Sequence, residues 1–406
     1  MIPVKNQVAS PLRGIYLVRS IPKNLCLRCI DAILGLGRAL AKSHDPQSAG
    51  GPRRILVANG AALGDVILAT AVLPVLKSAY PAADLGMLVG SGSKPVLANH
   101  PLLRWVHTVD HWRMDRSDRT AWAKWIRYWR SRAAALREVR SVGYDAAIDL
   151  YYFFPNSILF LWQAGIPVRV GYTSAGLGPL LTHPTRWQLR DCSVVDYHAD
   201  LVRRLGVPES HFAKLAPSLP HPTTNASRGH FSGLDSNDEY LVLHIGTGFA
   251  IKEWPVEKWR SLVARLANGG RRLVFTGAGS KEVKIVERVL ENMPNCVNLC
   301  NALNWSDFVS VIAEARGVLG VDSVAAHVAA AVGTPCVVIA PGIANRWHWR
   351  PRSKDCAVVT QTVPCSPCYR QYGCAEMECV RSISVGAVLS EVDRLFVPSP
   401  NQAVTS

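Results

Sequence analysis

Residues 54–66 read RILVANGAALGDV and combine a short apolar run, a glycine-containing turn and the start of a helix. The run at 55–59 has the length and aliphatic content of a buried strand, and the apolar spacing from 66 to 79 is helical. Further strands are predicted at 85–89 and 145–150, with helical segments between them. Strands separated in this way predict right-handed crossovers and a mostly parallel sheet.

The same alternation restarts in the second half of the chain. Residues 220–237 (PHPTTNASRGHFSGLDSN) are polar, rich in turn-forming residues and without periodicity, so they form the predicted domain boundary. The strands predicted after them lie at 240–245, 272–276, 296–299, 317–321 and 335–340, with helices at 256–267, 281–292, from 305 and at 325–332. The sequence thus predicts an α/β fold with two Rossmann-like domains, 51–222 and 238–398, that face each other across a cleft.

Residues 1–50 form an N-terminal arm in which aliphatic residues are interleaved with cations. Pro22 is expected to divide the arm into two short helices, and 45–52 (DPQSAGGP) has the composition of a linker. Residues 1–54 carry nine Lys or Arg against two acids. Two interpretations are open: a basic amphipathic arm that lies in an anionic bilayer surface, or a helix that packs on the body with solvated charges.

The composition is that of a globular protein, with 49% hydrophobic and 18% charged residues among 406. A formal net charge of +15 favours polyanionic partners, namely nucleic acid, an anionic membrane or phosphorylated substrates. Because no apolar run of about 18 residues is present and cations interrupt every apolar stretch near the N-terminus, we expect neither a transmembrane helix nor a signal peptide. A cytoplasmic location is expected, with most of the 11 cysteines reduced.

The turn after the first strand, 59–65 (NGAALGD), is the first candidate site. It lacks the Gly-x-Gly-x-x-Gly spacing of dinucleotide-binding folds, and Asp84 precedes the second strand instead of following it, so nicotinamide binding is disfavoured. Asp65 opens the following helix. It is either a first-turn acid that complements the helix dipole or a general base at the end of a strand.

Loops of small and polar residues follow three strands predicted for the second half, and they indicate a nucleotide-diphosphate site. Small residues let a ligand approach the backbone, a hydroxyl donates to phosphate, and a lysine offers a cation, although a lone lysine is equally compatible with a solvated surface position. The residues predicted to line this nucleotide-diphosphate site are Thr247 and Gly248, then Lys252 before Trp254-Pro255, then Gly277 and Gly279, and finally Asp322, Ser323 and His327.

Three segments carry a family resemblance that covers most of residues 53–385. They are 54–68 (RILVANGAALGDVIL), 252–259 (KEWPVEKW) and 320–335 (GVDSVAAHVAAAVGTP). In order and approximate spacing they resemble the opening Gly-Asp turn, the Lys-x-Trp-Pro segment and the donor motif of glycosyltransferase family 9, the heptosyltransferases of lipopolysaccharide synthesis. Ser323 and Val324 stand where Thr and Gly are commoner in that family.

The resemblance implies a GT-B fold and inverting, metal-independent transfer of heptose from ADP-heptose to a lipopolysaccharide core or related glycan, with no cofactor. It implies that Asp65 is the catalytic carboxylate, Lys252 the phosphate-binding lysine and Asp322 the donor-binding acid. Thr247, Ser323 and His327 correspond to residues around the diphosphate and ribose. Physical reasoning agrees, because inversion needs one carboxylate to take the acceptor proton while a cation and a helix N-terminus stabilise the departing diphosphate.

Two further features have alternative interpretations. The aromatic and basic segment 104–140 belongs to the half that the resemblance assigns to an anionic glycolipid acceptor, for which Gly64, Arg113 and Arg116 are candidates; a plain surface helix with some core tryptophans is the other interpretation. The second feature is a set of four cysteines whose number suits a tetrahedral zinc but whose spacing is irregular, so structural zinc, free thiols and an incidental cluster stay open. These are Cys365, Cys368, Cys374 and Cys379.

The sequence therefore predicts a peripheral glycosyltransferase on the inner face of the cytoplasmic membrane, with a nucleotide sugar, an anionic glycolipid and an anionic lipid surface as partners. A family relative that uses a different nucleotide sugar is the nearest alternative. A non-catalytic nucleic-acid-binding protein would explain the charge. However, it would leave Asp65 and the ordered donor loops without purpose, and no nucleic-acid motif is present, so no nucleic-acid partner is expected.

Overall fold

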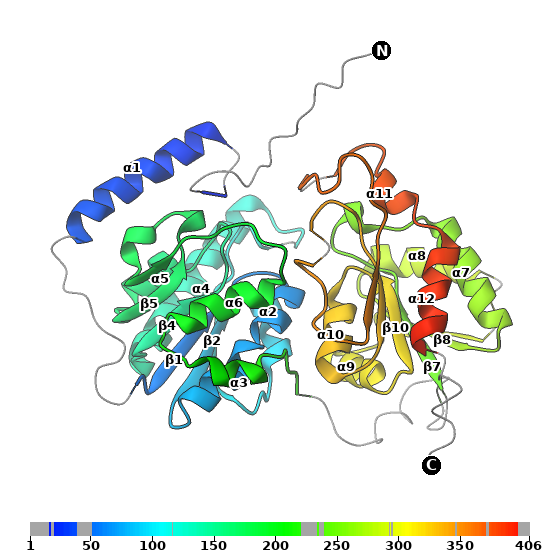
Figure 1. Ribbon diagram of the computed structural model, residues 1–406, viewed down its shortest axis with the longest axis horizontal. Helices are drawn as coiled ribbons and strands as arrows, with labels where there is room; N and C mark the ends of the chain where they lie inside the picture. The colour runs from blue at the N-terminus through cyan, green and yellow to red at the C-terminus, as the bar shows by residue number, and fades with distance from the viewer. Residues whose placement is uncertain are drawn as a thin grey trace. The chain divides into compact units, whose positions relative to one another are not determined.

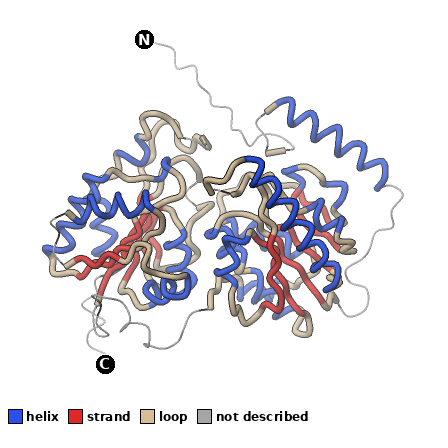
Figure 2. The backbone as a smooth tube through the Cα atoms, turned by 180° about the vertical axis from the view of Figure 1, so that it is seen from behind, coloured by secondary structure: helices blue, strands red, loops and turns tan. Residues whose placement is uncertain are grey.

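A computed structural model describes residues 16–17, 20–38, 51–115, 117–220, 234, 239–291, 293, 295–345, 347–370 and 373–396. The chain divides into two compact units, Met1–Pro220 and His221–Ser406. Each unit contains a six-stranded sheet whose paired strands are all parallel, with helices on both faces (Figures 1 and 2).

The first sheet has the strand order β3-β2-β1-β4-β5-β6. Its strands are β1 (Arg54–Ala58), β2 (Asp84–Val89), β3 (Leu103–Thr108), β4 (Ala146–Asp149), β5 (Val168–Tyr172) and β6 (His183–Thr185). The α-helices of this unit are α1 (Ile21–Arg38), α2 (Leu63–Ala69), α3 (Val72–Ala79), α4 (Ala121–Val142), α5 (Ile158–Gln163) and α6 (Val194–Arg203). Its 3-10 segments are η1 (Ser91–Leu97), η2 (Thr173–Ala175), η3 (Gly178–Leu180) and η4 (Glu209–Lys214).

The second sheet repeats this pattern with the order β12-β11-β10-β7-β8-β9. Its strands are β7 (Tyr240–His244), β8 (Arg272–Phe275), β9 (Cys296–Asn298), β10 (Gly317–Val321), β11 (Cys336–Ile339) and β12 (Cys356–Val359). The helices are η6 (Ala250–Lys252), α7 (Val256–Asn268), α8 (Ser280–Leu290), α9 (Trp305–Ala313), α10 (Val324–Val332), α11 (Glu378–Arg381) and α12 (Val385–Phe396).

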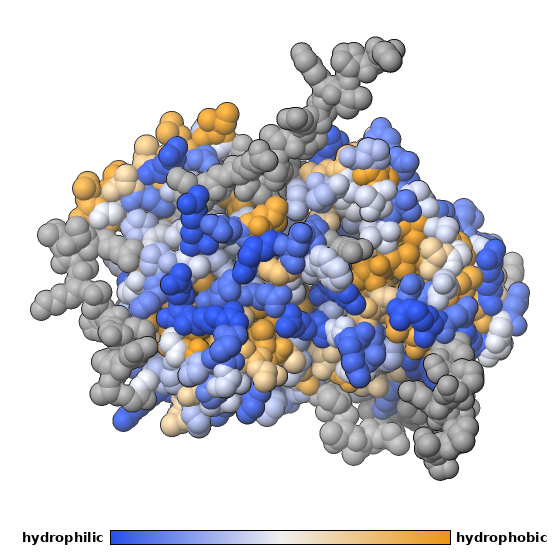
Figure 3. All heavy atoms as spheres, in the orientation of Figure 1, coloured by the Kyte–Doolittle hydropathy of each residue, from blue (hydrophilic) through white to orange (hydrophobic). Residues whose placement is uncertain are grey.

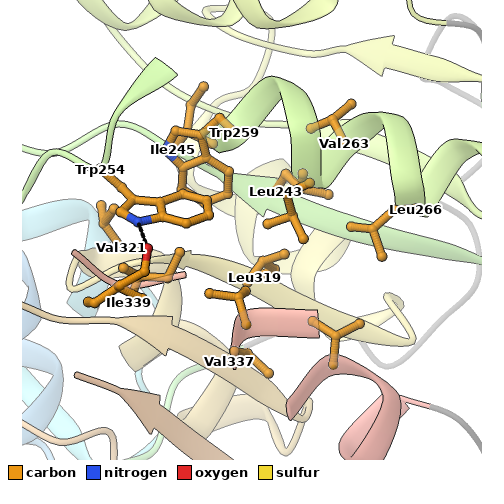
Figure 4. Close-up of a cluster of buried hydrophobic side chains, with 14 of the residues drawn as sticks. Leu243, Ile245, Trp254, Trp259, Val263, Leu266, Leu319, Val321, Val337 and Ile339 are labelled. Atoms are coloured by element: carbon orange, nitrogen blue, oxygen red, sulfur yellow. Dashed lines mark hydrogen bonds between the residues drawn. The ribbon is translucent and has the colours of Figure 1, made fainter. Parts of the chain in front are cut away.

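The central strands are covered on both faces, so they read as continuous aliphatic runs instead of alternating ones. All residues of β4, β7, β10 and β11 are buried. In the second unit, α7 and α12 cover one face, where aliphatic side chains of β7, β8, β10 and β11 form a core with Trp254 and Trp259 (Figure 4). The Trp254 ring meets Trp259 edge to face at 5.0 Å, and its indole N–H donates to the Ile383 carbonyl at 3.2 Å.

The structure differs from the sequence-based expectations in several places, and β3, β5 and β6 were not predicted. The helix predicted over 66–79 is two helices, because the chain breaks at Thr70, whose hydroxyl donates to the Ile67 carbonyl at 2.6 Å. Pro22 does not divide α1; it lies in the first turn, where a missing N–H costs nothing. The strand expected at 335–340 is not the last, since β12 follows it.

Most of the first predicted helix of the arm and most of the two predicted linkers lie outside the described residues. Within the described ranges, no helix is long and apolar enough to cross a membrane.

Gly86 on β2 provides a stability test of the first unit. A Cβ at this position would overlap the Tyr144 hydroxyl, which is bonded to His107 Nε2 at 2.9 Å. We expect Gly86→Ala to lower the free energy of unfolding by about 1–3 kcal/mol, measured by urea denaturation. Gly92→Ala is the control, because a Cβ there meets nothing within 4 Å. Equal stability of the two variants would contradict the predicted overlap.

Candidate active site

Each sheet reverses its strand order at one point, and that point brings loops from distant segments together. The reversal lies between β1 and β4 in the first unit and between β7 and β10 in the second. In parallel α/β sheets, ligands bind outside the carboxyl ends of the strands at such a switch point. Asp65 follows β1, Lys252 follows β7 and Asp322 follows β10, so each of these predicted residues lies at a switch point of its own unit.

Lys252 and Asp322 form an ion pair, with Nζ and Oδ2 separated by 2.7 Å and side chains 23% and 17% exposed. Lys252 ends the short η6 segment, two residues before the buried Trp254. Asp322 is held on the other side by its backbone N–H, which donates to the Ile339 carbonyl of β11 at 3.0 Å. Both charges are therefore fixed by the core of the second unit.

Helix α10 begins beside this pair and leaves polar groups unsatisfied. Ser323 is its N-cap residue, yet its hydroxyl makes no capping bond and is buried without a partner among the described residues. His327, one helical turn later, is 6% exposed, and its Nδ1 also lacks a partner in the described part of the chain. Burial lowers the pKa of His327 to about 4, so the ring is neutral at pH 7. Unsatisfied polar groups at a helix N-terminus are typical of an anion-binding site.

Asp65 is held in the first turn of α2, at the third helical position. Its Oδ2 accepts the backbone N–H of the N-cap residue Ala62 at 3.1 Å. Gly64 precedes it, and the Asn59 side chain fixes the turn by accepting the Ala61 N–H at 3.1 Å. Asp65 is half-buried, so its carboxylate combines a helix-capping bond with access to the carboxyl edge of the sheet.

Comparison with known proteins identifies the family. A family model described as glycosyltransferase family 9 (heptosyltransferase) matches residues 132–378. The chain belongs to glycosyltransferase family 9. It is 24% identical over 72% of its length to lipopolysaccharide heptosyltransferase 3 of Escherichia coli, covering 84% of that protein. It is 23% identical over 78% of its length to lipopolysaccharide heptosyltransferase 1 of Pseudomonas aeruginosa, covering 86% of that protein.

Solved structures agree on the fold. A family 9 glycosyltransferase from Veillonella parvula matches with a TM-score of 0.70 at 20% identity, over 88% of this chain and all of that one. The E. coli ADP-heptose lipopolysaccharide heptosyltransferase II matches with a TM-score of 0.65 at 22% identity, over 85% of this chain and 98% of that one. This family 9 glycosyltransferase therefore has a two-domain α/β fold of the GT-B type, as the sequence predicted.

The side chain of Glu282 lies against two of the glycine-containing loops in the second unit, a contact that the sequence analysis did not predict. A Cβ at Gly277 would come within 2.8 Å of the Glu282 carboxylate, and a Cβ at Gly246 would overlap it. The carboxylate accepts the Ala278 N–H at 2.9 Å, and burial raises the pKa of Glu282. The small residues of this glycosyltransferase thus admit an acidic side chain. A glutamate in the first turn of α8, after two glycine-containing loops, was the available sequence signal.

The other loop residues occupy the places expected from the sequence. Thr247 and Gly248 lie between β7 and η6, where the Thr247 hydroxyl accepts the Phe249 N–H at 3.3 Å. Gly279 is the N-cap residue of α8 with φ +93°, a conformation that favours glycine, and its N–H donates to the Asn301 side chain at 2.7 Å.

The acceptor-side candidates are only partly described. Arg113 lies in the connection after β3, with its guanidinium over the rings of Trp112 and Phe154 at 5.7 and 5.4 Å. Because Phe154 follows β4, Arg113 lies at the same carboxyl edge as Asp65. Arg116 lies outside the described residues. The tryptophans of α4 do not enter the core: three of them are exposed on one stripe, namely Trp122, Trp125 and Trp129.

A second carboxylate of this edge has a structural role. Asp149 ends β4, is 1% exposed, and accepts the backbone N–H of Ser157 at 2.6 Å and of Tyr151 at 3.3 Å. Burial raises the pKa of Asp149 to about 7. It orders the loop that contains Tyr152, whose pKa is raised by burial and by the nearby charge of Asp65.

The four C-terminal cysteines have thiols that are not in disulfides. Cys365 is exposed, whereas Cys368 and Cys379 are buried. Across the described ranges, no group of three or more His, Cys, Asp or Glu side chains is arranged to hold a metal ion.

The buried histidines predict how the second unit responds to pH. Burial lowers the pKa of His244 and His327 to about 4, below the value near 6.5 expected in the unfolded chain. Between those values the unfolded state binds more protons than the folded state. The stability that the neutral histidines contribute is therefore fully present above pH 6.5 and is lost as the pH falls towards 4. His327→Gln should reduce the loss between pH 7 and pH 5 by about 1–2 kcal/mol in urea denaturation. Identical pH slopes for wild type and variant would refute this.

Proposed function

We propose that this glycosyltransferase transfers heptose from ADP-heptose to a lipopolysaccharide acceptor, with inversion at the anomeric carbon and without a metal ion. The observation that carries the proposal is the ion pair of Lys252 with Asp322 beside the unsatisfied N-terminus of α10. The names of the relatives in E. coli and P. aeruginosa support heptose as the sugar. Assay of transfer with a panel of nucleotide sugars tests the donor, and another preferred sugar would refute it.

The leaving group defines what the second unit must supply. When the sugar–phosphate bond breaks, negative charge develops on the departing diphosphate, and preorganised cations and N–H groups stabilise it. Lys252 offers the remaining N–H donors of its ammonium, which Asp322 orients. Further hydrogen-bond donors come from the first N–H groups of α10, the Ser323 hydroxyl and neutral His327, and none of them needs a metal ion to bind phosphate. Transfer is therefore expected to persist in the presence of a chelator.

The acceptor hydroxyl defines what the first unit must supply. Inverting transfer proceeds by a single displacement, in which the hydroxyl oxygen forms the new glycosidic bond as its proton passes to a base. Asp65 is assigned this role, because its carboxylate sits at the switch point of the first unit. Arg113, at the same edge, is assigned to anionic groups of the acceptor. We assign the enzyme to the inner face of the cytoplasmic membrane, where a lipid-linked acceptor of this kind is found.

The base assignment is tested by Asp65→Asn. The amide oxygen still accepts the Ala62 N–H, so the helix cap is kept while the base is lost. Transfer should fall by about 10²–10⁴-fold with unchanged ADP affinity, measured by product mass spectrometry and calorimetry. Asp196→Asn is the matched control, because Asp196 makes the same capping bond to Ser193 in α6. Near-normal transfer by Asp65→Asn, or an equal loss in the control, would refute the assignment.

The leaving-group assignment is tested by Lys252→Ala. A charge-assisted bond to phosphate contributes about 1.5–3 kcal/mol, so calorimetry should show ADP affinity lowered at least tenfold. Asp322→Ala should also weaken donor binding, because the ammonium loses the group that orients it. Lys281→Ala is the control lysine of the same unit, since it pairs with Glu253 and is 63% exposed. Unchanged ADP affinity in both site variants would place the diphosphate elsewhere.

A further inference from the structure

Helix α1 is attached to the first unit along one narrow stripe. Leu27, Asp31 and Leu34 recur at helical spacing and are half-buried. The Leu27 side chain fits against Gly176, where a Cβ would come within 2.7 Å of it, and Leu34 packs on a small cluster formed by Ile158, Leu180 and Leu181.

Asp31 supplies the polar part of this attachment. Its Oδ1 accepts the Leu177 backbone N–H at 2.7 Å, and its Oδ2 accepts the Tyr16 hydroxyl at 2.7 Å. The Leu17 N–H donates to the Ser174 carbonyl at 2.7 Å, so the chain before α1 is held as well. Asp31 is the single acidic residue of α1, and it faces the protein.

The arc of the helix opposite this stripe is apolar and exposed. Its large side chains are among the most exposed hydrophobic residues in the described part of the chain: Leu25 (60%), Ile33 (69%), Leu36 (78%) and Ile21 (83%). They lie on the arc opposite the attached stripe, and hydrophobic residues coat the outer side of α1 in Figure 3. Lys23 and Arg28 lie at the two boundaries between this arc and the protein.

We propose that the outer face of α1 inserts in the plane of an anionic lipid bilayer, with Ile21, Leu25, Ile33 and Leu36 below the headgroups and Lys23 and Arg28 at the phosphates. An apolar arc bordered by cations and free of outward acids fits this partner, because cations at such a boundary reach lipid phosphates while their stems cover apolar surface. A protein partner would bury the apolar arc equally but would not require anionic charge.

The attachment also determines which part of the enzyme the membrane holds. η2, to which the chain before α1 is bonded, follows β5 and belongs to the same carboxyl edge as Asp65 and Phe154, whereas η3, on which α1 rests, leads into β6. Insertion of α1 therefore fixes that edge relative to the lipid surface. The inference deepens the proposed function and rests on it for the purpose of the contact, since the proposed acceptor is anchored in the same lipid.

The aromatic stripe of α4 is the competing lipid contact. Trp122 and Trp125 are stacked at 5.1 Å, and Trp129 meets Trp125 edge to face at 5.9 Å. Tryptophan is typical of membrane interfaces. We favour α1 because its exposed aliphatic side chains extend from Ile21 to Leu36, whereas the tryptophans of α4 already cover part of their apolar surface by packing on one another.

The experiment compares full-length variants in sedimentation with vesicles of phosphatidylethanolamine and phosphatidylglycerol. Leu25→Gln/Ile33→Gln should bind at least tenfold more weakly than wild type, because two large apolar side chains lose their insertion. Leu189→Gln is the matched control, an exposed leucine of the same unit outside α1, and should bind like wild type. High salt, or replacement of phosphatidylglycerol by phosphatidylcholine, should weaken wild-type binding by removing the electrostatic part.

Calorimetry with ADP in each variant keeps this test separate from the proposed function. Weak vesicle binding with normal ADP affinity in Leu25→Gln/Ile33→Gln supports the inference, whatever sugar the enzyme transfers. Wild-type vesicle binding by this variant overturns it, as does equal loss in Leu189→Gln. A loss in Trp122→Gln/Trp125→Gln with none in the α1 variant assigns the contact to α4 and also overturns it. Vesicle binding that does not change with the charge of the lipid overturns the proposal that the bilayer must be anionic.

Discussion

The pairing of β7 with β10 is the constraint on which the chemistry of the second unit depends. Gly320 is the partner of His244 in this pairing, and a Cβ there would come within 2.5 Å of the His244 carbonyl oxygen. A glycine therefore allows the two strands to lie side by side at their carboxyl ends. Only because they do so can Lys252, which follows β7, reach Asp322, which follows β10 some 70 residues later.

The core and the charges of that unit reinforce each other. Trp254 is buried against Trp259 and bonded to Ile383, so the loop that carries Lys252 has little freedom (Figure 4). A charged pair that is largely removed from water is costly unless its geometry is fixed by the surrounding structure. Here the fixed pair stands beside a helix N-terminus with an unpartnered hydroxyl and imidazole nitrogen, and this combination favours a polyanionic ligand.

The first unit uses similar physics for a different purpose. Asp65 caps α2 through one oxygen, which fixes the orientation of the carboxylate before any substrate is present. Asp196 caps α6 in the same way, but α6 follows the edge strand β6 and not a strand of the switch point. Because both aspartates make the same capping bond, that bond does not single out Asp65, and the assignment of Asp65 as the base rests on its place after β1 in the strand order. Helix α1 shows the same dependence on tertiary context. Asp31 bonds the helix to the Leu177 backbone N–H, and this bond decides which face of α1 points outward.

The sequence by itself determined the alternation of buried strands and helices and the family, and it predicted Asp65, Lys252 and Asp322 as site residues. These features depend on local patterns: continuous aliphatic runs, a Gly-Asp turn and a lysine before Trp-Pro. The edge strands β3 and β12 were missed because they are partly exposed, so their apolar signal is weak. Glu282 was missed because it approaches Gly246 through space and not along the chain. Tertiary structure alone decided that Lys252 pairs with Asp322 and which face of α1 meets the protein. The ion pair depends on the order in which parallel strands pair, and the attached face of α1 depends on contacts such as that of Asp31 with Leu177, which no local pattern connects.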